Sequence, residues 1–315
     1  MRFKKKQLLI LSFLFFYLLG LIIKFCLHLD NFTLIVMPDT QRYSYENHNI
    51  FCNQTEWIVA NKQKLNIIFV SHLGDITQSG ALVNDEWENA SKCMGKLDGV
   101  VPYGVVPGNH DFDTVDNPTT EAIKYDSIFP VVRFSKFPWY KGNYKENRNS
   151  YQTITVSGMN LLFLNLEVDP TNDDIDWANK VLSENQDKQV ILTTHAYQYD
   201  NVASRSQSPH FRLGGNSGED IWDKLVSRNC NIFLVLSGHF HSSEGENKIK
   251  SKNRCGKTVY QVIQNYQGRP NSGNGLLRIY TFSPIKKQIS VKTFSTVSNN
   301  YENDANSQFT LYLDR

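Results

Sequence analysis

A short polar motif follows an apolar run that has the composition of a β-strand. The run Val105-Val106-Pro107 leads directly into Gly108-Asn109-His110-Asp111. The amide oxygen of Asn109 can bind a metal ion, and the imidazole of His110 can transfer a proton. Asp111 can accept a hydrogen bond from His110 and hold that imidazole in one tautomer. The same residues would also fit a simple polar turn, so the motif gains meaning from similar clusters elsewhere.

Residues of metal-ligand type come directly after five predicted strands. They are Asp39, Asp75, Asn109 with His110, His195, and His239 with His241. In an open α/β sheet the carboxyl ends of the strands meet in one crevice, so these distant side chains would lie together there. Oxygen and imidazole ligands suit Mn²⁺, Fe or Zn²⁺, whereas the lack of thiolates argues against a structural zinc site. A single histidine after a strand usually only packs, but five such strand ends favour a metal site.

The elements that must position these residues alternate in type. Apolar strands are predicted at 32–37, 66–70, 103–106, 189–194 and 231–236, a hairpin at 151–156 and 160–166, and helices at about 54–64 and 83–97, from 173 onward and up to about 228. This alternation predicts a sheet built from βαβ units. Period-two patterns at 258–264, 275–282, 288–294 and 308–313 predict an antiparallel completion of the sheet.

The stretch 112–149 carries few regular signals but many aromatic residues. A long loop in a compact domain is usually functional or disordered, and this aromatic content is unlike disorder. Two interpretations remain open, a cap over the active site or packing at the surface. Among the other histidines, we expect His72 to pack, whereas His48 and His210 lie in polar loops and could approach a substrate.

The composition is that of a globular protein. The chain has 315 residues, 40% of them hydrophobic, which is enough for a sizeable core, and a net charge of +2. Basic and acidic residues are interspersed, so nothing indicates a nucleic-acid-binding patch. We find no linker after the first thirty residues and therefore predict one domain over 31–315.

The first thirty residues differ from the rest. Four basic residues within the first six precede an apolar run from Leu8 to Ile23, with Lys24 and a shorter apolar patch after it. This pattern predicts a signal-anchor or a signal peptide over 1–30, with the catalytic domain outside the cytoplasm. No small-residue cleavage site follows, which favours an uncleaved anchor, with secretion after cleavage as the alternative. Since the domain would start at Phe32, we expect its active face near the bilayer surface.

The cysteines fit an exported protein. Apart from Cys26 in the apolar run, Cys52, Cys93, Cys230 and Cys255 could form two disulfides. Cys230 and Cys255 flank one strand-and-loop unit and are the favoured pair. Four buried thiols are the alternative.

Taken together, the motifs resemble those of the calcineurin-like metallophosphoesterase superfamily. They are Asp39-Thr40-Gln41, Gly74-Asp75, Gly108-Asn109-His110-Asp111, His195 and Gly238-His239-Phe240-His241, in the family's order. The resemblance extends from Phe32 to the C-terminus and is greatest to the exported branch, whose first motif often departs from the usual pattern. It implies an α/β (α+β) fold in which two mixed β-sheets pack as a sandwich flanked by helices, with a dimetal site at the carboxyl ends of the strands.

The resemblance also implies a ligand set for two divalent metal ions. Asp75 would bridge both metals. One metal would also bind Asp39, Gln41 and His241, and the other would bind Asn109, His195 and His239. Gln41 stands where histidine is commonest, and an amide oxygen is a harder and weaker ligand than imidazole.

The implied activity is hydrolysis of phosphate mono- or diesters by a metal-bridging hydroxide. His110, oriented by Asp111, would protonate the leaving group. A different interpretation is a membrane-tethered binding module with a degenerate, non-catalytic site, which only Gln41 favours. The residues do not select one phosphoester substrate.

Overall fold

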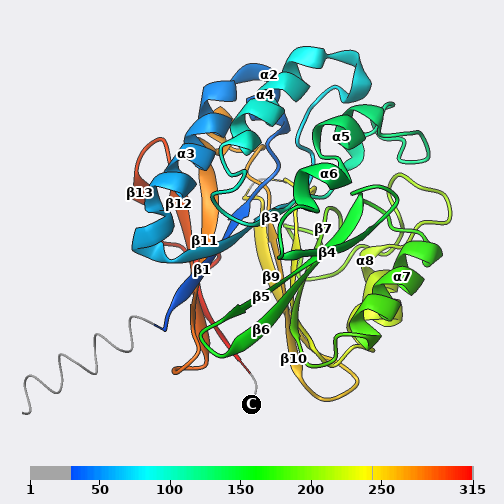
Figure 1. Ribbon diagram of the computed structural model, residues 1–315, viewed down its shortest axis with the longest axis vertical. Helices are drawn as coiled ribbons and strands as arrows, with labels where there is room; N and C mark the ends of the chain where they lie inside the picture. The colour runs from blue at the N-terminus through cyan, green and yellow to red at the C-terminus, as the bar shows by residue number, and fades with distance from the viewer. Residues whose placement is uncertain (1–29, 243, 314–315) are drawn as a thin grey trace, which may run out of the picture.

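Two seven-stranded sheets pack face to face in the computed structural model, which describes residues 30–242 and 244–313. Both sheets are mixed, and helices flank the sandwich (Figure 1). The predicted fold class is therefore confirmed. The segment predicted as a signal-anchor or signal peptide lies, except for Asp30, outside the described residues. Within the described ranges, no helix combines the length and apolar composition needed to cross a membrane.

The first sheet is parallel at one end and antiparallel at the other. It contains β1 (Phe32–Met37), β2 (Ile67–His72), β3 (Tyr103–Gly104), β11 (Leu276–Ser283), β12 (Gln288–Ser295), β13 (Asn300–Tyr301) and β14 (Gln308–Tyr312). The order is β13-β12-β11-β1-β2-β3, with β14 also paired to β12. β1, β2 and β3 run parallel, while β11 pairs antiparallel with β1. Every residue of β1 is buried, which explains its nearly continuous apolar sequence.

The second sheet contains β4 (Tyr140–Tyr144), β5 (Asn149–Val156), β6 (Met159–Leu166), β7 (Gln189–Thr194), β8 (Ile232–Ser237), β9 (Glu246–Lys252) and β10 (Thr258–Gln264). The order is β4-β5-β6-β7-β8-β10-β9. Segment 258–264, which is β10, was expected to join the sheet in the antiparallel direction. That expectation is wrong for one of its two neighbours, because β10 runs parallel to β8. β9 runs back along the edge of the sheet, so β10 enters between β9 and β8 and is parallel to β8. The carboxyl end of β10 therefore lies beside that of β8.

Helices cover the outer faces of both sheets. The helical elements are α2 (Gln41–Glu46), α3 (His48–Leu65), η1 (Gly80–Leu82), α4 (Asn84–Gly95), η2 (Asn109–Asp111), α5 (Ile123–Ile128), α6 (Val131–Phe134), α7 (Asn172–Ser183), α8 (Gly218–Ile221), η3 (Trp222–Val226) and η4 (Pro270–Gly273). α3 and α4 pack on the first sheet, and α7, α8 and η3 pack on the second (Figure 1). Thr171 begins α7 by accepting a hydrogen bond from the Asp174 N–H.

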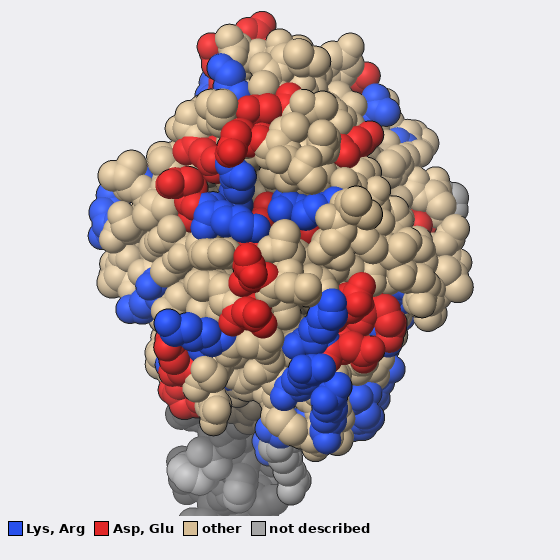
Figure 2. All heavy atoms as spheres, turned by 90° about the vertical axis from the view of Figure 1, so that its right-hand side faces the viewer, with Lys and Arg blue, Asp and Glu red and all other residues tan. Residues whose placement is uncertain are grey.

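The aromatic stretch 112–149 forms α5, α6 and β4, and much of it packs into the core. Phe129, Phe134 and Tyr140 are buried with residues of α3 and α4 in one cluster. These three rings therefore belong to the core, which is neither the cap nor the surface packing that the sequence left open. The face in Figure 2 carries basic and acidic side chains next to one another, in keeping with the small net charge.

Two disulfides connect neighbouring elements. Cys52 in α3 bonds to Cys93 in α4, and Cys230 before β8 bonds to Cys255 before β10. The predicted Cys230–Cys255 pair is confirmed.

A buried ion pair lies between the sheets. Nη2 of Arg278, in β11, is 2.7 Å from Oε1 of Glu246, in β9, and both side chains are almost completely buried. Tyr266, Thr293 and Ser307 donate hydroxyl hydrogen bonds to the same carboxylate, and Nη2 of Arg269 lies 3.3 Å from its Oε2.

The chain enters the sandwich at the end opposite the predicted metal ligands. β1 runs upward from Phe32 in Figure 1, and Asp39 comes only after its last residue, Met37. The full length of β1 therefore separates Phe32 from the predicted ligands, and the expected position of the active face near a bilayer surface stays a prediction.

Candidate metal centre and active site

The carboxyl ends of five strands bring the predicted site residues to one edge of the sandwich. The structure places Asp39 after β1, Asp75 after β2, Asn109 and His110 in η2 after β3, His195 directly after β7, and His239 and His241 after β8. Since β1, β2 and β3 are parallel in one sheet and β7, β8 and β10 in the other, these loops come from both sheets. The strand-end placement expected from the sequence is what the structure shows.

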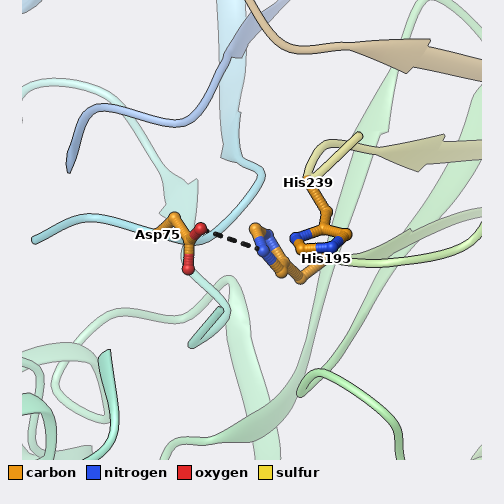
Figure 3. Close-up of side chains that lie close together, drawn as sticks. All are labelled: Asp75, His195 and His239. Atoms are coloured by element: carbon orange, nitrogen blue, oxygen red, sulfur yellow. Dashed lines mark ion pairs between the residues drawn. The ribbon is translucent and has the colours of Figure 1, made fainter. Parts of the chain in front are cut away.

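Asp75, Asn109, His195 and His239 form the centre of this group. Nε2 of His195 lies 3.3 Å from Oδ2 of Asp75 and 3.0 Å from Oδ1 of Asn109. One ligand atom from each of Asp75, His195 and His239 lies within 4.8 Å of the others, and Figure 3 shows the three side chains facing one another. Nδ1 of His195 donates to the Leu73 carbonyl at 2.8 Å, so in the neutral ring Nε2 carries the lone pair.

The electrostatics of this centre call for positive charge. Burial acts to lower the pKa of His195, but the carboxylates of Asp75 and Asp39 outweigh it and raise that pKa to about 10. Burial acts to raise the pKa of Asp75, but His195 holds it below its ordinary value. Burial, and then repulsion from His195, lowers the pKa of His239 to about 3, so its ring is neutral, the form that binds metals. A bound cation would neutralise the negative charge of the Asp75 and Asp39 carboxylates.

Asp39 and Gln41 present unpaired oxygens next to this centre. Oδ2 of Asp39 accepts from the Asn265 amide at 2.6 Å and from the His239 N–H at 3.1 Å, whereas its Oδ1 is buried and has no partner in the part of the chain that the structure describes. Gln41 is also buried, and its Oε1 has no partner among the described residues. Burial raises the pKa of Asp39 well above its ordinary value. Buried oxygen acceptors without donors fit a cation, because leaving them unpaired costs free energy.

His241 lies at the exposed side of this second group. Its Nδ1 is 2.9 Å from the His239 carbonyl and 3.3 Å from Nε2 of Gln267. The ring is exposed, unlike those of His195 and His239. The predicted ligands Asp39, Gln41 and His241 thus lie around the residues that follow β10.

Glycines allow the loops to approach the carboxylates. A Cβ atom at Gly108 would collide with Oδ1 of Asp75, and a Cβ atom at Gly238 would collide with Oδ1 of Asp39. Asp75 and His239 themselves have positive φ angles of 47° and 65°, which non-glycine residues rarely adopt. Such backbone strain tends to occur at functional sites.

Asp111 does not orient His110, so that prediction is wrong. Its carboxylate turns back into η2 and accepts backbone N–H groups of Gly108, Ile76 and Thr77, each at 2.9 Å. It thereby ties the Asp75 loop to the Asn109 loop. Nδ1 of His110 instead lies 2.6 Å from the carbonyl of Gln78. Because a carbonyl only accepts, Nδ1 carries the proton and Gln78 sets the tautomer.

Two other histidines, His72 and His210, lie close to the candidate site. His72 is buried and its Nε2 lies 3.0 Å from the hydroxyl oxygen of Thr40, so it packs as expected. The centroid of the His239 ring lies 5.8 Å from that of the His210 ring and 5.1 Å from that of the Phe211 ring. His210 therefore borders the centre, as expected of a residue that could approach a substrate.

Asn265 and Gln267 were not predicted as site residues. Asn265 donates to Asp39 and also to the His239 carbonyl, at 2.8 Å, and Gln267 accepts a hydrogen bond from the Gln41 amide. The signal was present in the sequence, because both residues come just after a predicted strand, as the other ligands do. An antiparallel β10 would end at the opposite edge of the sheet, so the expected direction gave no reason to place these two residues at the site.

Comparison with known proteins gives a family match and similar structures. A family model described as calcineurin-like phosphoesterase matches residues 32–243. YvnB, an uncharacterized protein of Bacillus subtilis (strain 168), is 36% identical over 295 residues, which cover 90% of this chain and 22% of YvnB. The chain thus spans about a fifth of the length of that relative.

Two solved structures share the fold. A dimetal phosphatase from Danio rerio superposes with a TM-score of 0.55 at 12% identity, covering 90% of this chain and 99% of that one. GAP50, the anchor in the inner membrane complex of Plasmodium, superposes with a TM-score of 0.52 at 12% identity, covering 90% of each chain. At these identities the similarity is one of fold.

Proposed function

The chain belongs to the calcineurin-like phosphoesterase family, and from that premise we propose that it hydrolyses phosphate mono- or diesters with two divalent metal ions. The observation that carries this proposal is the pair of unpaired buried oxygens, on Asp39 and Gln41, beside the group of Asp75, Asn109 and His195. Both observations call for cations at adjacent positions.

The donor set supports two metal positions that share Asp75. Asp39, Gln41 and His241 would hold one ion, and Asn109, His195 and His239 would hold the other. Oxygen and imidazole ligands suit Mn²⁺, Fe or Zn²⁺. When bound, such a pair of ions lowers the pKa of a water and neutralises charge on the phosphoryl oxygens.

His110 has the contacts of a general acid. Its backbone N–H donates to Oδ1 of Asp75 at 2.9 Å, which fixes the residue against the centre. With Nδ1–H bonded to Gln78, a second proton on the ring sits on Nε2, and from this imidazolium form Nε2 can pass the proton to a leaving alkoxide and return to the neutral ring. The ring is half-buried, so a substrate can reach it.

The test uses the full chain, stripped of metal with EDTA and reloaded separately with Mn²⁺, Fe²⁺ or Zn²⁺. Bound metal is measured by elemental analysis, and hydrolysis is followed with p-nitrophenyl phosphate and bis(p-nitrophenyl) phosphate. The proposal expects two equivalents of metal and turnover that EDTA abolishes. A chain that binds no metal, or hydrolyses neither ester when loaded, would overturn it.

The alternative is a tethered binding module whose site has lost activity, and the substitution at Gln41 is the observation that favours it. This alternative expects bound metal without turnover. The two proposals therefore differ in hydrolysis at full metal occupancy.

We also propose that the N-terminal segment holds the protein in a membrane as a single-pass anchor, with the catalytic domain outside the cytoplasm. The basic residues before the apolar run support this orientation. With a C-terminal tag, protease added to intact cells should remove the tag and leave the N-terminus in the membrane fraction. A soluble extracellular protein would indicate a cleaved signal, and a protected cytosolic tag would overturn export.

A further inference from the structure

We infer that Gln267 is a positioning residue that decides which atom of Gln41 faces the metal. This inference rests on the proposed function, because it concerns one of the two proposed metal positions. Gln267 follows β10, whereas Gln41 begins α2 after β1, so the contact joins the two sheets at the site.

A glutamine can offer either face of its amide to the site. Its oxygen accepts hydrogen bonds and could bind a cation, whereas its NH₂ group only donates and would repel one. Rotation about the last side-chain bond exchanges the two atoms, and the shape of the surrounding cavity barely distinguishes them. An imidazole, the commonest ligand type at this position in the family, does not carry this ambiguity in the same form.

Gln267 removes the ambiguity by accepting from Gln41. Nε2 of Gln41 donates to Oε1 of Gln267, which leaves Oε1 of Gln41 buried and without a partner among the described residues. In the opposite orientation, the Gln41 NH₂ group would occupy the buried position and its oxygen would face the oxygen of Gln267. The acceptor on Gln267 therefore selects the orientation in which Gln41 can be a ligand.

The main chain of Gln267 is held in place beside the site. Its backbone N–H donates to Oδ1 of Asn265 at 3.2 Å, and the Asn265 side-chain amide donates to Asp39 and to the His239 carbonyl. Nε2 of Gln267 lies 3.3 Å from Nδ1 of His241. Nδ1 of His241 is closer to the His239 carbonyl, at 2.9 Å, and donates to it, so Nε2 of that ring is free for a metal. Gln267 thus lies between two proposed ligands of the same ion.

The experiment measures Mn²⁺ binding to the full chain by calorimetry and elemental analysis, with no need for turnover. Gln267→Leu removes the acceptor, while Gln267→Glu keeps an acceptor and has nearly the same shape. Gln41→Leu and the double variant Gln41→Leu/Gln267→Leu complete a double-mutant cycle, which measures the coupling between the two side chains. The matched control is Gln54→Leu, because Gln54 is a buried glutamine that donates to the Leu276 carbonyl at 2.9 Å, between α3 and β11.

The expected result is a loss of affinity at one of two sites. Gln267→Leu should weaken one Mn²⁺ equivalent by about 10–100-fold, as for other residues that orient metal ligands, and leave the second equivalent unchanged. Gln267→Glu should restore most of the affinity. The double variant should bind no more weakly than Gln41→Leu alone, because Gln267 acts through Gln41.

Three results would overturn the inference while leaving the proposed function intact. They are a Gln267→Leu titration that superimposes on that of the wild type, additive losses in the double variant, and an equal loss in the Gln54→Leu control. A wild-type chain that binds none of Mn²⁺, Fe²⁺ and Zn²⁺ would instead remove the proposed function, and the inference with it.

Discussion

Nε2 of His195 lies 3.3 Å from Oδ2 of Asp75, although His195 follows β7 in one sheet and Asp75 follows β2 in the other. The packing of the two sheets therefore sets the distance between these ligands. Phe69 of β2 and Phe163 of β6 stack across the same interface with ring centroids 3.8 Å apart. A close-packed core of this kind holds the two halves of the site in place.

Asp75→Asn should remove most of the bound metal. The amide keeps the shape of the carboxylate but loses the charge that two cations would share. We expect a fall in activity of about 10³-fold or more. Elemental analysis checks the metal content, with the exposed Asp187→Asn variant as control. Two full equivalents of metal in Asp75→Asn would refute the bridging role.

His110→Gln should retain both metals but slow hydrolysis of esters with poor leaving groups, by ~10²–10⁴-fold, as expected for loss of a general acid. The loss should shrink for p-nitrophenyl esters, whose leaving group needs no proton. Rates across a series of leaving-group pKa values test this. A loss of equal size across the series would mean that His110 positions the phosphate instead.

Asp111→Asn should act on stability rather than on proton transfer. Its carboxylate accepts three backbone N–H groups, and an asparagine, with one oxygen, leaves at least one of them unpaired. We expect a loss of about 1–3 kcal/mol in the free energy of unfolding, measured with denaturant. The dependence of rate on the leaving group should match that of the wild type, since Gln78 sets the tautomer of His110. A dependence like that of His110→Gln would restore the orienting role to Asp111.

Glu246→Gln should change how stability depends on pH. Burial acts to raise the pKa of Glu246, but Arg278 and the Tyr266 and Ser307 hydroxyls outweigh it and lower that pKa. A carboxyl whose pKa is lower in the folded chain stabilises the fold above its unfolded pKa, about 4.3, and loses this contribution as pH falls through the folded value.

The Glu246→Gln variant should therefore lose stability at pH 7, by about 3 kcal/mol, because Arg278 stays buried without its partner charge. The difference between the variant and the wild type should shrink as pH falls below the unfolded pKa of about 4.3 and through the lower folded pKa. Denaturant unfolding at pH 3 to 7 measures both effects, with the largely exposed Glu244→Gln as control. A constant difference at every pH would show that the charge of Glu246 is not involved.

The sequence predicted which residues meet at this edge of the sandwich because each proposed ligand follows an apolar strand, a pattern that local composition reveals. It missed β9 and β4 for physical reasons. β9 reads Glu-Asn-Lys-Ile-Lys-Ser-Lys, and such charged sequences suit an edge strand, which needs no apolar pattern. β4 contains a glycine and only five residues, so its strand signal is weak.

The contacts of Asp111 and Gln267 could not be derived from spacing. Whether Asp111 faces His110 or its own backbone depends on the turn of η2, which four letters do not fix. Gln267 reaches Gln41 only because β10 is parallel to β8, and direction within a sheet depends on the path of the whole chain. Glutamine is moreover an infrequent metal-site residue, so no motif draws attention to it.

The direction of β1 leaves one end of the sandwich, away from the candidate site, available for attachment to a solid support. Phe32 begins that strand and the described chain ends at Leu313, and in Figure 1 both lie at the end of the sandwich away from α2 and the Asp39 loop. Six residues of extended chain span about 20 Å. Immobilised through a tag attached directly after Leu313, the domain would turn the edge that carries Asp39 and His195 outward, toward the surrounding solution. Resin-bound protein should therefore admit bulky phosphoesters as readily as free protein does.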